Sequence, residues 1–288
     1  MDQRLADLLQ LLELEQLELN LFRGESRDIG SPQVFGGQVL GQALSAAAAT
    51  VEGRMAHSLH AYFLRRGDCN APIVYEVDRS LDGRHFSNRR VVAIQHGQQI
   101  FNMTASFQVA ESGFDHQIPM PQVPAPEALA DSAAGPPPEV LARLPERVRR
   151  FFEQPRPFEF RTVQPIDYLR PRRAAPAREI WFRTVGAVGD DEMLHRRLLA
   201  YVSDFFLLDT ATLPHGTSIL SGAVVMASID HAMWFHRPLR VDDWLLYAMD
   251  SPSASGARGF ARASVFARDG RLVASTAQEG LVRMRKDS

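Results

Sequence analysis

Two segments of the chain alternate between apolar and polar residues over short runs, the pattern of half-buried β-strands. In the first segment the runs are residues 73–77, 89–94 and 100–108, and in the second they are residues 244–248, 261–266 and 272–278. Gly97 and Gly270 precede the last run of each segment and favour turns. Each segment therefore predicts an antiparallel meander of strands.

One amphipathic helix is predicted upstream of each meander. The first covers residues 37–50, where many small residues would let the helix lie close to a sheet. The second covers residues 191–208, with Asp190 or Asp191 as its N-cap. Apolar residues recur with a helical period in both stretches: Val39, Leu40, Ala43, Leu44 and Ala47, then Leu194, Leu198, Tyr201, Phe205 and Leu208.

The two segments repeat one another. S-L-H-A-Y-F-L-R-R-G (residues 58–67) is similar to S-I-D-H-A-M-W-F-H-R-P (residues 228–238), and matching His60 with His231 gives an offset of 231 − 60 = 171. Two copies of a sheet wrapped on a helix could pair edge to edge and hide their open edges. We therefore expect an α+β fold with two similar domains, residues 1–115 and 158–288. A proline-rich linker, residues 116–157, joins them and includes a short helix near residues 140–144.

Composition narrows the function. The 288 residues are 45% hydrophobic with a net charge of −2, which gives no basic field for nucleic acid. No apolar run approaches the roughly 18 residues of a membrane span. The acidic, helical N-terminus has no secretory signal pattern, and Cys69 is the only cysteine. These features predict a protein of a reducing cytoplasm with no disulfide and no cysteine metal cluster. Lys286 is the only lysine and alanine is abundant, a bias that indicates a bacterium with GC-rich DNA.

Histidines do not predict a metal site. His57 and His60 are three residues apart and His231 and His236 five apart, but neither pair has a third ligand in a zinc-binding pattern. We expect His60 and His231 to be inward polar residues of strands with backbone partners.

Five blocks of the chain resemble signatures of the acyl-CoA thioesterase II family, whose members have a double hotdog fold. They are Q-V-F-G-G-Q-V-L-G-Q-A-L (33–44), H-S-L-H-A-Y-F-L-R-R-G-D (57–68), M-T-A-S-F-Q (103–108), I-D-H-A-M-W-F-H-R-P (229–238) and S-T-A-Q-E-G-L-V (275–282). The resemblance implies two antiparallel sheets, each wrapped on a central helix and joined into one continuous sheet. It also implies hydrolysis of acyl-CoA to a fatty acid and coenzyme A, without a cofactor.

The family's catalytic trio of aspartate, hydroxyl residue and glutamine is carried over to Asp204, Ser228 and Gln278. The carboxylate would take a proton from water, while the hydroxyl and the amide hold that water, so no acyl-enzyme is required. Ser228 departs from the usual threonine of the family. It keeps the hydroxyl but loses the β-branch that restricts the rotamer. Without the resemblance, Asp204 also reads as a surface aspartate and Gln278 as an ordinary strand residue.

Substrate contacts are expected at two kinds of position. Gly36, Gly37 and Gln38 begin the first helix, where free N–H groups could polarise the thioester carbonyl; alternatively, the glycines only permit a tight helix entry. Arg65, Arg66, Arg237 and Arg258 are candidates for the coenzyme A phosphates, or else ordinary surface charges.

The first half lacks the trio in the repeat alignment, since His57 answers Ser228 and the strand answering Gln278 carries Ala105 and Ser106. One catalytic site is therefore expected, in the second half. Two other functions stay open: a hotdog enoyl-CoA hydratase, and a non-catalytic acyl-CoA-binding or sensory module. Exposed sheet edges favour a homo-oligomer, dimer or tetramer. The sequence fixes neither this number nor the acyl chain length.

Overall fold

The computed structural model describes residues 1–30, 33–130, 138–144, 146–165, 171–218 and 221–285. The strands in these ranges join one 13-stranded sheet in which neighbours run antiparallel. Their bounds are β1 (Glu15–Glu18), β2 (Leu21–Gly24), β3 (Met55–Phe63), β4 (Ile73–Asp82), β5 (Phe86–Gln95), β6 (Gln98–Gln108), β7 (Phe158–Thr162), β8 (Ala177–Thr184), β9 (Val224–Ser228), β10 (Asp230–Phe235), β11 (Leu245–Ser255), β12 (Arg258–Ala267) and β13 (Leu272–Met284). The order is β1-β2-β4-β5-β6-β3-β10-β13-β12-β11-β8-β7, with β9 pairing to β13.

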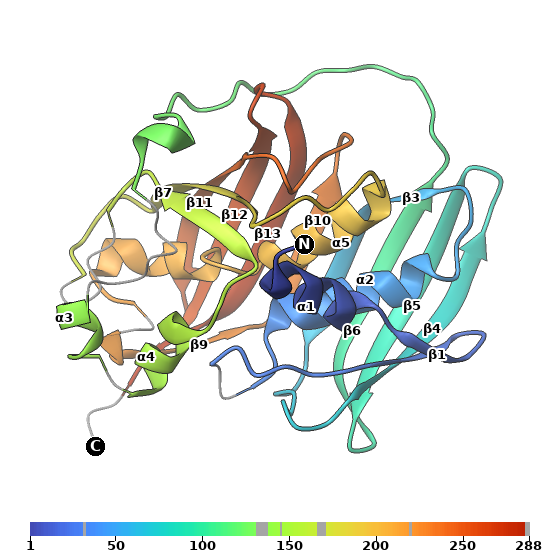
Figure 1. The fold of residues 1–288 in the computed structure, drawn as a ribbon, viewed down its shortest axis with the longest axis horizontal. Coiled ribbons are helices and arrows are strands. Elements are labelled where there is room, and N and C mark those ends of the chain that lie inside the picture. The colour runs from blue at the N-terminus through green and yellow to red at the C-terminus, as the bar shows by residue number, and fades with distance from the viewer. Residues whose placement is uncertain (31–32, 131–137, 145, 166–170, 219–220, 286–288) are drawn as a thin grey trace.

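Two helices lie at the centre of the molecule. α2 (Gly36–Ala48) and α5 (Glu192–Val202) pack against each other, with β3–β6 on one side of the pair and β10–β13 on the other (Figure 1). β3 and β10 pair along the middle and join the two meanders into one sheet. This is the predicted double hotdog architecture.

The predicted apolar stripes are buried, except that Leu194 and Phe205 of the second are only partly so, and the stripes explain where the helices lie. Leu40, Ala43, Leu44 and Ala47 of α2 are completely buried in one core with residues of both halves. At the start of α5, the Asp191 carboxylate accepts hydrogen bonds from two backbone N–H groups, so Asp191 is the N-cap.

The second helix ends earlier than predicted. α5 stops at Val202, and a 3-10 helix, η3 (Leu208–His215), follows after a turn. Phe206 in that turn has φ of 65°, a left-handed conformation that interrupts a right-handed helix. The apolar periodicity continued to Leu208, but it does not record this change of backbone direction.

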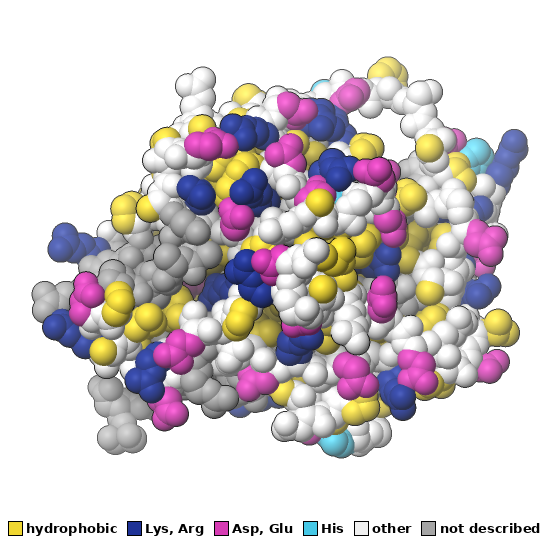
Figure 2. Space-filling view, viewed as in Figure 1, with side chains coloured by type: hydrophobic (Ala, Val, Ile, Leu, Met, Phe, Trp, Pro, Cys, Tyr) yellow, Lys and Arg dark blue, Asp and Glu magenta, His cyan; other side chains and the backbone are white. Residues whose placement is uncertain are grey.

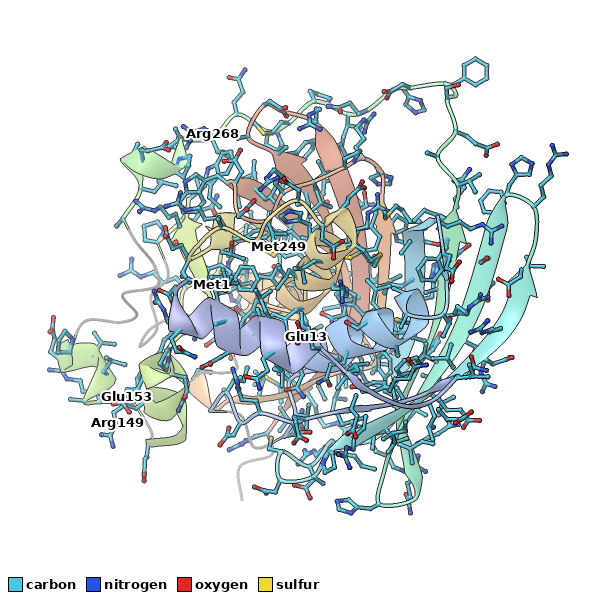
Figure 3. The ribbon with its side chains drawn as sticks, turned by 45° about the vertical axis from the view of Figure 1, so that its right-hand side comes forward. Met1, Glu13, Arg149, Glu153, Met249 and Arg268 are labelled. Carbon is cyan, nitrogen blue, oxygen red and sulfur yellow. The ribbon has the colours of Figure 1, made fainter. Side chains whose placement is uncertain are left out.

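An N-terminal helix, α1 (Gln3–Leu12), covers one side of α2. Asp2 caps it, and Leu5, Leu8, Leu11 and Leu12 are its buried residues. The Leu11 carbonyl accepts a hydrogen bond of 2.7 Å from the buried Gln42 side chain of α2. Figure 3 marks the two ends of the α1 segment with Met1 and Glu13.

The segment between the halves lies across the second half. It contains the 3-10 helix η1 (Pro126–Ala128), α3 (Pro138–Leu141) and α4 (Glu146–Glu153), so the short helix predicted near residues 140–144 begins earlier. The Trp181 indole donates to the Pro124 carbonyl at 3.0 Å, and Arg268, labelled in Figure 3, forms a bidentate ion pair with Glu127. Residues 131–137 and 145 of the expected linker lie outside the described residues.

His60 points outward, so the prediction that both histidines point inward is wrong for His60. His60 is exposed, whereas its neighbours Leu59 and Ala61 are buried, and His231 is only 1% exposed. Successive residues of a strand face opposite sides, so a slip of one residue exchanges the two faces. Matching His60 with His231 had aligned an outward position with an inward one.

The strand register gives the corrected alignment. Leu59 pairs with Ala105 of β6, and the β10–β13 ladder, continued by one residue, puts His231 opposite Gln278. His231 therefore answers Leu59, an offset of 231 − 59 = 172, and the β4–β5 and β11–β12 ladders also superimpose at 172. By the same pairing Gln278 corresponds to Ala105, so β13 is offset from β6 by 278 − 105 = 173.

The surface carries both signs of charge. On the face drawn in Figure 2, arginine and acidic side chains are interspersed. Among the described helices, none combines the length and the apolar character needed to cross a lipid bilayer. Within the described ranges, no three histidine, cysteine or acidic side chains come together as a metal site would need.

Candidate active site

Asp204 lies in the turn after α5 rather than on the helix. It follows the end of α5 by two residues and faces the first turn of α2. A Cβ added to Gly36 would come within 2.6 Å of Asp204 Oδ2, so a side chain at that position would displace the carboxylate. The glycine is therefore required by how closely the carboxylate approaches the start of α2.

Ser228 and Gln278 reach Asp204 from two neighbouring strands. Ser228 ends β9 and pairs with Gly280 of β13, and Gln278 faces inward from β13 and is fully buried. Gln278 Nε2 lies 2.8 Å from Asp204 Oδ1 and 3.0 Å from Ser228 Oγ, so both amide protons have acceptors. Ser228 Oγ is 3.4 Å from Asp204 Oδ1. The structure thus brings together the three side chains named from the sequence.

The environment of Asp204 favours its protonated form. Burial raises its pKa from 3.8 to about 6, although hydrogen bonds from Gln278, the Gly37 N–H and Ser228 act in the opposite direction. The group is thus ionised at neutral pH but binds a proton more readily than an exposed aspartate. These are the properties of a general base that operates near pH 7.

The glycines at the start of α2 permit close packing, and the backbone N–H of Gly37 also donates a hydrogen bond to the Asp204 carboxylate. A Cβ on Gly37 would lie 2.1 Å from the Tyr201 carbonyl oxygen, so α2 and α5 approach this closely only with glycine there. Gln38 lies apart from the trio: its side chain donates to the Glu25 carbonyl and accepts from the Arg27 N–H. Its backbone N–H bonds to the Phe35 carbonyl at 3.0 Å.

The four candidate arginines are dispersed. Arg65 and Arg66 are exposed just beyond β3, where the Arg65 side chain donates to the Gln99 carbonyl at 2.7 Å. Arg258 forms an ion pair with Glu279 at 3.0 Å, and Glu279 directly follows Gln278 in β13. The structure does not bring Arg237 to the trio.

Arg237 binds the linker instead. It donates to the His116 carbonyl of the linker at 3.3 Å, forms an ion pair with the adjoining Asp115 and donates to the Leu272 carbonyl at 2.8 Å. Leu272 is six residues before Gln278 along β13, about 20 Å at the rise of a strand.

The corresponding region of the first half is filled by a buried arginine. At the offset of 172, Ala56 rather than His57 answers Ser228, so that part of the predicted alignment is wrong. Arg89 of β5 is only 1% exposed and pairs with Ala105 of β6. Because Ala105 corresponds to Gln278, Arg89 lies beside the position that this glutamine has in the second half.

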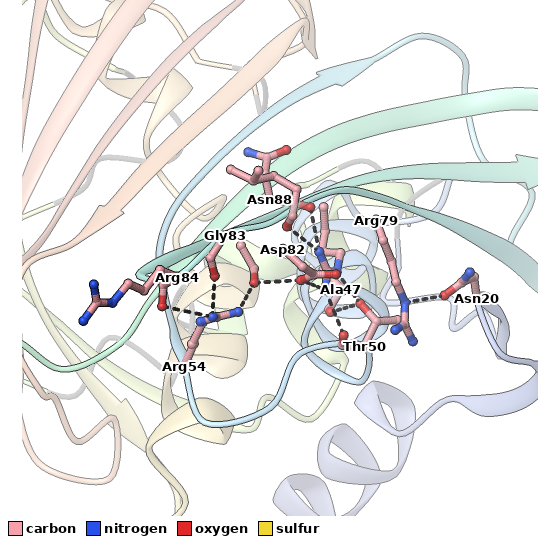
Figure 4. A network of polar contacts seen from close by, with 12 residues as sticks. Asn20, Ala47, Thr50, Arg54, Arg79, Asp82, Gly83, Arg84 and Asn88 are labelled. Carbon is pink, nitrogen blue, oxygen red and sulfur yellow. Dashed lines mark hydrogen bonds and ion pairs between the residues drawn. The ribbon is translucent and has the colours of Figure 1, made fainter.

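The Arg89 guanidinium donates hydrogen bonds from all three of its nitrogens. It donates to the Thr50 hydroxyl at 2.8 Å, to the Asp82 carboxylate at 2.6 Å and to the Leu81 and Asn88 carbonyls at 2.9 Å each. Figure 4 shows Thr50, Asp82 and Asn88 in this network. Thr50 follows α2 by two residues, as Asp204 follows α5. A structural ion pair thus stands in the first half where the second half has the trio.

Both halves match models of one enzyme family. Residues 23–108 match the acyl-CoA thioesterase N-terminal domain, and residues 148–281 match acyl-CoA thioesterase. The chain is 45% identical to acyl-CoA thioesterase 2 of Haemophilus influenzae, over 97% of this chain and 98% of that protein. The chain belongs to the acyl-CoA thioesterase II family.

Further relatives agree with this assignment to the acyl-CoA thioesterase II family. Human acyl-coenzyme A thioesterase 8 is 41% identical over 96% of this chain and 88% of its own length. The crystal structure of an acyl-CoA thioesterase II, TesB2, from Mycobacterium marinum is 40% identical, with a TM-score of 0.78 over 97% of this chain and 99% of that one. A hot dog protein from Alicyclobacillus acidocaldarius shares the fold at 18% identity and a TM-score of 0.79. The predicted family, hotdog fold and enzyme class are confirmed.

Sequence reasoning missed part of the surroundings of the trio in this acyl-CoA thioesterase. His231 was expected only as a strand residue with backbone partners, but its Nε2 lies 3.0 Å from the Ser203 hydroxyl, directly before Asp204. Phe206, two residues after Asp204, was read as part of a helix. The inward and outward alternation around His60 would have indicated the correct offset for His231, but no pattern in the sequence marks Phe206.

Proposed function

We propose that this chain hydrolyses acyl-CoA thioesters with a water molecule activated by Asp204 and held by Ser228 and Gln278. The observation that carries the proposal is that Gln278 Nε2 is within 3.0 Å of both Asp204 Oδ1 and Ser228 Oγ. A carboxylate with two hydrogen-bonding neighbours is the equipment needed to orient and deprotonate one water.

The reaction then proceeds without a covalent enzyme intermediate. Asp204 accepts a proton from the water molecule while the water oxygen attacks the thioester carbonyl carbon. The tetrahedral intermediate collapses, the C–S bond breaks, and coenzyme A leaves as a thiolate that takes up a proton. Because the pKa of a free thiol is about 8.5, the leaving group needs little acid assistance. The positive end of the α2 dipole, next to the carboxylate at Gly36, would stabilise negative charge that develops there.

Aromatic rings beside Asp204 support an acyl chain as the other half of the substrate. Phe205 lies 4.4 Å from Phe35 and 5.8 Å from Phe160 between ring centroids, and Tyr201 lies 5.3 Å from Phe35. This group spans α5, the entry to α2 and β7. Arg65, Arg66 and Arg258 keep their proposed role with the coenzyme A phosphates, whereas Arg237 is engaged by the linker.

The proposal extends to the organisation of the protein. Residues 158–288 would form the catalytic hotdog and residues 1–115 its structural partner, joined by residues 116–157. A cytoplasmic homo-oligomer, dimer or tetramer, remains part of the proposal, and Cys69 as the only cysteine suits a reducing compartment.

Thiol release from palmitoyl-CoA tests the proposed function. The unaltered protein should turn over, and Asp204→Asn should bind the substrate but release thiol at least about 100-fold more slowly, because the base is lost. Binding by the unaltered protein without turnover would instead identify an acyl-CoA-binding module. Equal rates in the two proteins would exclude Asp204 as the base.

A further inference from the structure

Two buried acceptor atoms beside the trio have no hydrogen-bond partner among the described residues. They are Oε1 of Gln278 and Nδ1 of His231. The two side chains belong to β13 and β10 and are 0% and 1% exposed. Buried polar atoms are paired in the great majority of native structures, so two neighbouring orphans require a donor.

The hydrogen bonds fix both atoms as acceptors. Gln278 Nε2 donates to Asp204 and to Ser228, so the carbonyl oxygen of the amide points the other way. The Ser203 hydroxyl donates its single proton to the Ala200 carbonyl at 2.9 Å, so in its 3.0 Å contact with His231 the imidazole Nε2 must be the donor. Burial lowers the pKa of His231 to about 3, so the ring is neutral and Nδ1 carries a lone pair.

The two acceptors lie opposite each other on neighbouring strands. Continuing the β10–β13 register by one residue puts His231 opposite Gln278, and side chains at such positions start about 5 Å apart on one face. A water molecule has two protons to donate, which is what the two acceptors together need.

The first half shows that this pair belongs to the site and not to the fold. By the strand register the two corresponding positions are Leu59 and Ala105, both completely buried. The half without the trio therefore has apolar residues at both positions. A hotdog framework of this chain accepts leucine where His231 stands.

We infer that a buried water molecule bridges His231 Nδ1 and Gln278 Oε1, which makes His231 a positioning residue for the Gln278 amide. The bridge holds the amide with Nε2 toward Asp204 and Ser228. Without it, nothing on the far side of the amide opposes rotation, and a flipped amide would direct its oxygen at the Asp204 carboxylate.

The inference rests on the proposed function, and steady-state kinetics with palmitoyl-CoA separates the two. His231→Leu should lower kcat about 10- to 100-fold and change KM by less than about twofold, because the amide is misoriented while the substrate pocket is intact. His231→Asn, which offers an acceptor in place of Nδ1, should recover most of that kcat. In a Gln278→Ala background, His231→Leu should have no further effect.

His195→Leu is the matched control. His195 is 2% exposed, but its ring is fully paired, with Nε2 on the Gly189 carbonyl and Nδ1 accepting the Val241 N–H. This substitution should lower the melting temperature and leave kcat near that of the unaltered protein. A loss of kcat that merely followed stability would appear in both leucine variants and would overturn the inference.

Other outcomes are equally decisive. A kcat of His231→Leu within about twofold of the unaltered protein, or the same fold loss with and without Gln278, would overturn the role of His231 while Asp204→Asn still reports on the proposed function. Full activity of Asp204→Asn would instead exclude Asp204 as the base, the part of the proposed function on which the inference rests. Should His231→Leu not fold, a high-resolution crystal structure decides the matter. Water within about 3.2 Å of both atoms supports the bridge, and a direct contact between them or a dry site excludes it.

Discussion

Replacing Asp204 with asparagine is expected to abolish turnover and, at the same time, to stabilise the folded protein at alkaline pH. Burial raises the pKa of Asp204 from 3.8 to about 6, so the folded chain holds this proton more tightly than the unfolded chain. Ionisation of the carboxylate therefore destabilises the fold. This destabilisation is fully present above the folded pKa and is absent below the unfolded one.

The magnitude follows from the shift. A difference of about 2 units corresponds to about 3 kcal/mol of unfolding free energy at pH 8 and about 1 kcal/mol at pH 4.5. Asp204 is only partly buried, and solvent screening makes these upper values. Asparagine removes the charge, but its NH2 group cannot accept the hydrogen bonds that the carboxylate oxygen accepted. This mismatch lowers the unfolding free energy by about 1 kcal/mol at either pH. A net stabilisation of up to about 2 kcal/mol is expected at pH 8, and none at pH 4.5.

Urea unfolding of both proteins at the two pH values measures this quantity directly. Thiol release from palmitoyl-CoA on the same preparations shows whether activity is lost together with the gain in stability. An asparagine variant that is equally stabilised at pH 4.5 and pH 8, or destabilised at both, would contradict the assignment of a raised pKa to Asp204.

Further outcomes follow from the same geometry. The kcat/KM of the unaltered protein should fall as pH drops below about 6, because protonated Asp204 cannot accept a proton from water; a flat profile down to pH 5 would exclude it as the base. Ser228→Thr should retain or raise kcat, since it keeps the hydroxyl and restricts its rotamer, whereas Ser228→Ala should lower it severalfold. Arg89→Met should lower the unfolding free energy in urea by about 1–2 kcal/mol, with kcat unchanged, because the Thr50 hydroxyl and the Leu81 carbonyl lose a donor while water can solvate the half-exposed Asp82. Loss of kcat in well-folded Arg89→Met would show that the first half takes part in catalysis.

The repeat explains why much of the fold could be predicted. Strand-like runs recur in both halves, and each meander follows an amphipathic helix, so two similar sheets joined at their edges were the simplest arrangement. The ends of the elements and the register of the strands were harder to predict. Aligning the words around His60 and His231 matched letters but slipped by one residue, and in a strand that slip exchanges inside for outside. The pairing of Leu59 with Ala105, together with the burial of Leu59 and His231, gives the correct offset.

The second helix shows a different limit. Its apolar stripe continues smoothly to Leu208, while the backbone turns at Phe206 through a conformation that an aromatic residue rarely adopts. Tertiary packing, with Phe206 against Phe160 at 5.2 Å, accompanies this turn, and periodicity cannot report it. As a result Asp204 was expected within the helix predicted over residues 191–208, whereas it lies in the turn after α5.

The candidate site came from family resemblance rather than from local pattern. Gln278 alone looks like any polar residue of a strand, and Asp204 and Ser228 are 24 residues apart in the chain. Their convergence depends on β9 pairing with the far end of β13, a contact between distant segments that no spacing in the sequence encodes. The arginine that fills the first half was also invisible, because buried cations are rare enough to be read as surface charges.

A crystal structure of Asp204→Asn with intact palmitoyl-CoA would test the central claim most directly. We expect the thioester carbonyl carbon about 3–3.5 Å from a water that contacts the side chains at positions 204, 228 and 278. A thioester bound well beyond reach of a water on these side chains would contradict the account.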